Sequence, residues 1–156
     1  MEKLKLSLRC ENGVKCPPEL RRRIKAAALA VLRAEEVEGP CELSVLLTDG
    51  EGIHAINREF RDVDKPTDVL SFPMGDTDPV TGRYLLGDMV LNVPQAEKQG
   101  AAFGHGAGHE ISYLTVHSVL HLLGYDHVDE GPMKKQMRQR EKAVMAALEP
   151  DTATEE

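Results

Sequence analysis

The chain has 156 residues, an apolar content of 41% and a formal net charge of −7. This length favours one domain that can bury a core without disulfides. We expect the domain to span residues 1–150, with 151–156 as a frayed tail. No apolar run approaches the roughly 20 residues of a membrane-spanning helix. The N-terminal residues also lack the apolar stretch of a signal peptide, so the expected location is the cytoplasm.

Three cysteines, Cys10, Cys16 and Cys41, lack tight C-x-x-C spacing, which is typical of reduced cytosolic thiols. The negative net charge argues mildly against a nucleic-acid partner. However, residues 1–33 carry nine Lys/Arg and three Glu, and such a basic region can bind phosphates. For the run Arg21 to Arg23 we favour the simpler interpretation of a solvated helix surface.

Apolar periodicity and turn residues predict the following elements. In chain order they are a strand at 4–9, a helix at 19–34, a strand at 42–48, a helix at about 51–60, a strand at 68–72, a polar loop at 74–86, a strand at 87–93, a short helix near 95–100, a glycine-rich loop at 100–109, a helix at about 109–123 and a last helix at about 132–148. Asp49 is expected to cap the helix that follows it. This irregular alternation predicts one α+β layered domain, with a mixed sheet of roughly four strands and about five helices.

The run HSVLHLLGYDH at 117–127 is the most informative motif. His117 and His121 are four residues apart and therefore share one face of a helix. Gly124 can end that helix in a left-handed conformation and let His127 return to the same point. Three converging imidazoles with a fourth position open to water are typical of catalytic zinc. The sequence predicts one Zn²⁺ per chain at the end of a central helix, although another divalent transition metal suits such ligands.

A helical wheel of residues 111–123 places the apolar side chains on one arc, with His117 and His121 opposite its middle. We expect one side of this helix to dock on the core and the other to present both imidazoles. The remaining histidines, His54, His105 and His109, show no comparable spacing. The last two are expected to be auxiliary ligands at most.

The spacing of the three histidines and the glycine equals that of the metzincin proteases. In those enzymes a glutamate follows the first histidine and activates the zinc-bound water. Here Ser118 stands in that place, and a hydroxyl cannot act as the general base at neutral pH. The motif therefore keeps the zinc geometry but argues against peptide hydrolysis.

A second group of polar residues lies in INREFRDVDKPTDVLSF, at 56–72. Arg61, Lys65 and Thr67 can all contact phosphate, and Asp68 can orient one of them. A guanidinium holds phosphate oxygens through a planar fork and stabilises charge in a transition state. We expect Arg61, Lys65 and Thr67 to bind the substrate.

Three motifs together resemble the YbeY family of rRNA-maturation endoribonucleases, and they occur in the family's order. They are NREFRDVDKPTDVLSFP (57–73), LLGDMVLNV (85–93) and HSVLHLLGYDH (117–127). The resemblance implies a cytosolic, metal-dependent endoribonuclease specific for single strands. It would act in maturation of the small-subunit rRNA 3′ end and in ribosome quality control. The implied partners are single-stranded RNA or rRNA and the small ribosomal subunit or its proteins, with no membrane.

In this resemblance His117, His121 and His127 match the family's metal ligands, and Arg61 matches an arginine held to be important for function. We expect Arg61 and His117 to be catalytic, with Arg61 holding a non-bridging phosphate oxygen. The attacking group would be either a metal-activated water or the ribose 2′-OH. Two alternatives stay open, namely a metzincin-like zinc hydrolase acting on another substrate and a metal-stabilised ribosome assembly factor without catalysis.

Overall fold

The computed structural model describes residues 2–125 and 131–149. Its elements are β1 (Leu4–Cys10), α1 (Pro18–Ala34), β2 (Cys41–Thr48), α2 (Gly50–Arg61), β3 (Val69–Thr77), β4 (Tyr84–Asn92), α3 (Val93–Phe103), α4 (Ala107–Leu122) and α5 (Pro132–Leu148). The predicted α+β class, with a four-stranded mixed sheet and five helices, is confirmed. The expected frayed tail, 151–156, lies outside the described residues. Among the helices in the described ranges, none has the length and apolar character needed to cross a membrane.

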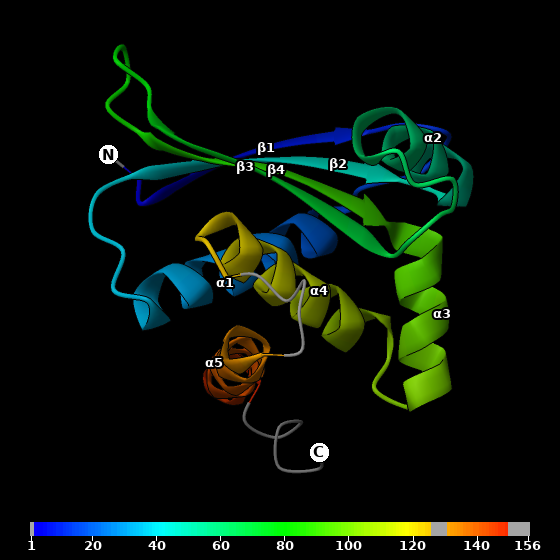
Figure 1. Cartoon of the computed structure of the whole chain (residues 1–156). Helices are drawn as coiled ribbons and strands as arrows, with labels where there is room; N and C mark the ends of the chain where they lie inside the picture. Colours follow the sequence, from blue (N-terminus) through cyan, green and yellow to red (C-terminus); the bar gives the residue numbers. More distant parts are fainter. Residues whose placement is uncertain (1, 126–130, 150–156) are drawn as a thin grey trace.

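The strand order of the sheet is β1-β2-β4-β3. β1 pairs with β2 and β2 with β4 in parallel, whereas β3 runs antiparallel to β4. Figure 1 shows α1 and α4 side by side against one face of the sheet, with α5 beneath them. On the opposite face α2 covers only one end of the strands (Figure 1). The helix with the histidines, α4, is therefore the central layer between the sheet and α5.

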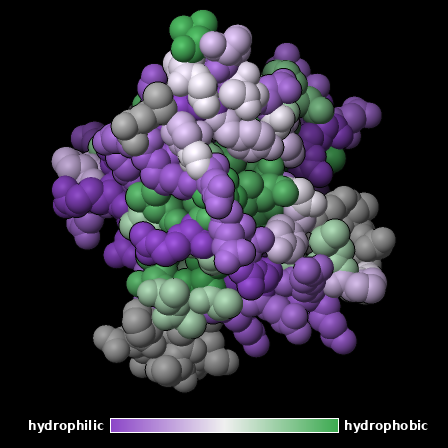
Figure 2. All heavy atoms as spheres, turned by 90° about the vertical axis from the view of Figure 1, so that its left-hand side faces the viewer, coloured by the Kyte–Doolittle hydropathy of each residue, from purple (hydrophilic) through white to green (hydrophobic). Residues whose placement is uncertain are grey.

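The main core fills the space between the sheet and these helices. The predicted apolar stripe of α1 is entirely buried there, through Ile24, Ala27, Ala28, Val31 and Leu32. A smaller cluster of Ile53, Leu70 and Val90 lies under α2. Figure 2 views the molecule from the left-hand side of Figure 1 and shows hydrophobic side chains in its middle, flanked by hydrophilic ones. The packed interior thus comes close to the surface at this end.

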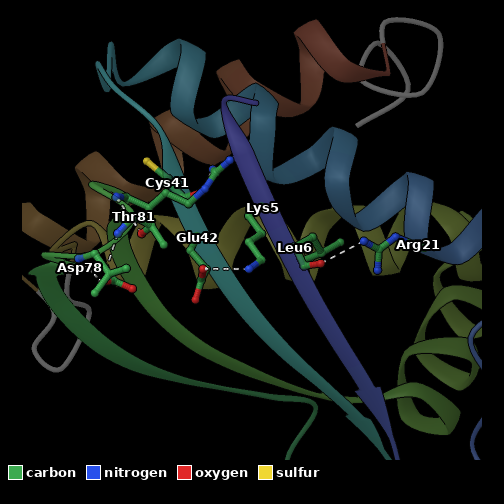
Figure 3. Close-up of polar contacts among 9 residues, drawn as sticks. Lys5, Leu6, Arg21, Cys41, Glu42, Asp78 and Thr81 are labelled. Atoms are coloured by element: carbon green, nitrogen blue, oxygen red, sulfur yellow. Dashed lines mark hydrogen bonds and ion pairs between the residues drawn. The ribbon is translucent and has the colours of Figure 1, made fainter. Parts of the chain in front are cut away.

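The prediction of a polar loop at 74–86 was wrong over most of its length. β3 continues to Thr77 and β4 already begins at Tyr84, so only residues 78–83 form the turn. The β3 arm is exposed near the turn, and its proline, glycine and polar residues obscured the strand pattern, whereas the β4 arm is half-buried to buried. Arg83 anchors the hairpin because its Nη1 donates to the carbonyl of Cys41 at 2.9 Å (Figure 3).

The arginine run on α1 makes structural contacts. Arg21 Nη2 donates to the carbonyl of Leu6 in β1 at 2.9 Å (Figure 3). Arg23 Nη1 lies 2.8 Å from Glu149 Oε1, at the end of α5. Arg21 and Arg22 are exposed, as a solvated helix surface requires, but the contacts of Arg21 and Arg23 also fasten α1 to the sheet and to the last helix.

Candidate functional site

The helix α4 is buried on more sides than its apolar arc predicts. Besides the apolar residues, the polar side chains of Ser112, Thr115 and Ser118 are buried, because sheet and helices pack around it. His117 keeps 22% of its side chain exposed, and His121 is half-buried. As expected, the side of α4 opposite the core contacts presents both imidazoles, although the helix is buried over more of its circumference than the apolar arc indicates. The imidazoles lie in a cleft instead of on an open surface.

The end of α4 forms a Schellman motif, as the glycine in the sequence motif predicts. Gly124 has a φ of +113°. Its N–H donates to the carbonyl of His121 at 3.0 Å, and the N–H of Tyr125 donates to the carbonyl of Leu120 at 3.1 Å. The chain therefore reverses directly after the second histidine. The third predicted ligand, His127, lies outside the described residues.

The rings of His117 and His121 are 4.8 Å apart between centroids and inclined by 76°. His117 Nδ1 lies 2.5 Å from Glu141 Oε2 of α5. A carboxylate that accepts a hydrogen bond from Nδ1–H fixes the tautomer in which Nε2 carries the lone pair. Histidines that ligate metals are commonly oriented in this way by a carboxylate behind them.

Glu141 is held in place by a second donor. Its side chain is buried, with 5% exposure, and Oε1 accepts a hydrogen bond of 3.0 Å from the hydroxyl of Tyr113. Burial and the adjacent Glu141 charge raise the pKa of Tyr113, so this hydroxyl stays protonated and keeps donating. Sequence reasoning missed Glu141. The available signal was a carboxylate on the apolar stripe of α5, in line with Met137 and Val144.

A cleft of about 530 Å³ joins the two groups of residues that the sequence singled out. It is lined by Arg61, Thr67, Asp68, Val69, Leu70, Ser71, Pro73, His117, His121, Gly124 and Tyr125. Two of the three predicted substrate-binding residues, Arg61 and Thr67, thus share a cavity with both described histidines. Lys65 is exposed and does not line this cleft.

The loop that carries the phosphate-capable residues is fixed through its backbone. Asn92, at the end of β4, donates from Nδ2 to the carbonyl of Thr67 at 3.0 Å and from its backbone N–H to the carbonyl of Asp68 at 2.9 Å. Asp68 accepts from the hydroxyl of Thr67 at 3.3 Å, as expected, and from the N–H of Val69 at 2.8 Å. Thr67 and Asp68 are therefore presented to the cleft by a rigid segment.

Ser118 has a structural contact at the place where a protease would have its glutamate. It is fully buried, and its Oγ lies 2.6 Å from Ser71 Oγ. This hydrogen bond ties α4 to β3 beside the cleft. The geometry agrees with the conclusion from sequence that this position supplies no general base.

Tyr125 is anchored by residues that the sequence did not point to. Its hydroxyl donates to Glu35 Oε1 at 2.7 Å, and Arg140 Nε donates to Glu35 Oε2 at 2.6 Å. The hydrogen bond to Glu35 is the main cause of a raised pKa of Tyr125. One carboxylate at the end of α1 thereby holds both α5 and the residue after the glycine turn.

The described donor set fits part of a zinc centre. Two neighbouring imidazoles, one of them backed by a buried carboxylate, are the nitrogen donors that zinc prefers. Within residues 2–125 and 131–149, no group of three His, Cys, Asp or Glu side chains is arranged to hold a metal ion. Because His127 is outside these ranges, the three-histidine site stays a prediction.

Comparison with known proteins agrees with the motifs. The family model described as Endoribonuclease YbeY matches residues 9–149. Proteins with that name from Clostridium botulinum and Chloroflexus aurantiacus are 40% and 41% identical. These alignments cover 88% and 92% of this chain and 93% and 94% of the relatives. The solution structure of TM1509 from Thermotoga maritima has the same fold, with a TM-score of 0.64 and 24% identity over 97% of this chain and 93% of that one. The chain therefore belongs to the YbeY family.

Proposed function

We propose that this protein is a metal-dependent endoribonuclease that cleaves single-stranded RNA. Its biological role in this proposal is maturation of small-subunit rRNA and ribosome quality control, in contact with the small subunit. Family membership supports the reaction class. The observation that carries the proposal is the shared cleft, in which Arg61 and Thr67 face the same cavity as His117 and His121.

The proposed ligands of one Zn²⁺ are His117, His121 and His127. When bound, the metal would supply Lewis-acid stabilisation for charge that builds up on the phosphate. Glu141 keeps His117 in the ligating tautomer and limits rotation of its ring. The described residues thus orient the site before substrate arrives.

Arg61 binds a non-bridging oxygen of the scissile phosphate in this proposal. It lies in the last turn of α2, is exposed, and lines the cleft. A guanidinium there offers several N–H donors to the charge of the transition state. The hydroxyl of Thr67 adds a contact to the phosphate, whereas Lys65 acts only at the rim.

Asp68 is the proposed proton acceptor. Among the described residues that line the cleft, Asp68 is the one whose side chain is a carboxylate and can accept a proton. The attacking group, either water or the ribose 2′-OH, gives its proton to this carboxylate as it bonds to phosphorus. The bond between phosphorus and the leaving ribose oxygen then breaks, and this oxygen takes up the proton that Asp68 received. Peptide hydrolysis is disfavoured because Ser118 is buried and hydrogen-bonded to Ser71.

The test is cleavage of a single-stranded RNA oligonucleotide by variants purified in parallel. We expect Arg61→Ala and His121→Ala to lower kcat by about 100-fold or more. Arg58→Ala is the matched control because Arg58 is exposed on the same helix and does not line the cleft. Asp68→Asn is expected to lower kcat without disturbing the loop, since the amide oxygen can still accept from Val69.

Full activity in both Arg61→Ala and His121→Ala would contradict the proposal, because it would trace the cleavage to a contaminating nuclease. Equal cleavage of single-stranded and duplex RNA would contradict the strand preference.

A further inference from the structure

A second cavity, of about 620 Å³, lies where the end of α3 and the start of α4 meet α5. Its walls include Phe103, His105, Tyr113, Arg138 and Lys142. None of the proposed catalytic steps uses it. We call it the α3–α5 cavity.

This cavity is linked to the candidate site through the contact between Glu141, which lines the cavity, and His117, which lines the cleft. Tyr113 and Glu141 line it, and the same two side chains stand behind His117. The rings of Tyr113 and His117 are 6.2 Å apart between centroids. Because Tyr113, His117 and His121 are spaced by four residues, they lie on one side of α4, with Tyr113 in this cavity and the two histidines in the cleft.

The charge that this cavity presents to solvent is positive. Its two carboxylates are buried and engaged, since Glu110 Oε2 accepts from Gln99 Nε2 at 2.7 Å and Glu141 accepts from Tyr113. Arg138 and Lys142, one turn apart on α5, are exposed. Two exposed cations, above carboxylates that are buried and already hydrogen-bonded, favour an anionic ligand at the solvent side of the cavity.

Exposed rings lie beside these cations. Phe103 has 62% of its surface exposed although it is a large apolar residue. The His105 ring stacks on that of His109 at 4.6 Å, and His109 Nδ1 lies 2.7 Å from Glu149 Oε2. Rings beside cations are the combination that binds single-stranded nucleic acid, with bases on the rings and phosphates on the cations.

We propose that the α3–α5 cavity binds a nucleotide of the RNA strand that lies beyond the two nucleotides flanking the scissile phosphate. Phe103 stacks on the base, and Arg138 and Lys142 contact the phosphate. The inference rests on the proposed function and deepens it, because it assigns the continuation of the strand beyond the candidate site. It also provides a stacking surface that is compatible with any base, as an enzyme selecting single strands needs.

The experiment measures affinity for a fluorescent single-stranded RNA of about ten nucleotides, together with its cleavage. We expect Phe103→Ala to weaken binding by roughly five- to 100-fold, the usual effect of losing one base stack. The double variant Arg138→Gln/Lys142→Gln should reduce the slope of log affinity against log salt by about 1.4. Lys135→Gln, an exposed lysine on α5 outside the cavity, serves as the control and should leave both quantities unchanged.

A dinucleotide substrate is too short to reach both cavities, so all three variants should cleave it like the wild type. Wild-type affinity and salt slope in Phe103→Ala and the double variant, with His117→Ala inactive, would overturn the subsite and leave the proposed function standing. Absence of RNA binding and cleavage by the wild-type protein would overturn the proposed function itself. Because the substituted residues are exposed, circular dichroism should show the same fold in every variant.

Discussion

Among the described residues, His117 and Glu141 form one of two histidine–carboxylate pairs between α4 and the C-terminal helix region. The second pair, His109 and Glu149, follows eight residues away on each helix, with Nδ1 and Oε2 2.7 Å apart. Because the helices run antiparallel, α4 supplies the imidazoles and α5 the carboxylates. Of the two histidines in these pairs, only His117 lines the cleft that Arg61 also lines. The second pair is therefore a natural control for the first.

Glu141→Gln should weaken metal affinity by about 10- to 100-fold, because the amide no longer fixes the tautomer of His117 as firmly. The measurement is zinc affinity by competition with a chromogenic chelator. Glu149→Gln removes the matching carboxylate from His109 and from Arg23. It should lower stability and leave zinc affinity unchanged. Equal zinc affinity in wild type and Glu141→Gln would contradict the positioning role.

Ser118→Ala should keep kcat within a few-fold of the wild type, because its hydroxyl contacts Ser71 and takes no part in the reaction. Loss of this buried hydrogen bond should cost about 0.5–2 kcal/mol of unfolding free energy. Urea unfolding and RNA cleavage are measured on the same preparation. A folded Ser118→Ala protein with 100-fold less activity would show that this hydroxyl takes part in catalysis.

Gly124→Ala should weaken zinc binding, because a φ of +113° strains any residue with a Cβ and the turn precedes the predicted ligand His127. The expected loss of stability is about 1–2 kcal/mol. Gly82→Ala is the control, since Gly82 has a φ of +75° in the distant hairpin turn. Both variants should lose stability, and only the first should lose zinc affinity. An identical zinc affinity in the two variants would refute the role of the turn.

Stability should fall in alkaline solution through Tyr113. Burial and Glu141 raise its pKa in the folded state, so the folded protein keeps a proton that the unfolded chain releases near the ordinary tyrosine pKa of about 10. The free energy of unfolding therefore falls as pH rises above roughly 10. Below that pH, Tyr113 makes the free energy of unfolding neither rise nor fall with pH. Tyr113→Phe should flatten this decline in urea unfolding series. An unchanged decline in that variant would assign the effect to another group.

The sequence alone predicts the elements that have a strong local pattern. The apolar stripe of α1 and the glycine turn after His121 both follow from residues close in the chain, and both are confirmed. The end of the β3–β4 hairpin was not predicted because the exposed part of β3, which contains a proline and a glycine, lacks apolar alternation. Glu141 was missed because its partner His117 is 24 residues away and on another helix. The role of Glu141 can be recognised only in the fold, where α5 packs on α4 and brings the carboxylate to His117.

Metal-dependent cleavage is the central claim, and titration of metal-depleted protein with Zn²⁺ tests it most directly. The rate of cleavage of a single-stranded RNA should rise linearly and reach its plateau at one equivalent of zinc per chain. His117→Ala, treated in the same way, should bind no zinc tightly and stay inactive. Cleavage by the depleted wild-type protein at its full rate, or a plateau with no bound zinc, would contradict the account.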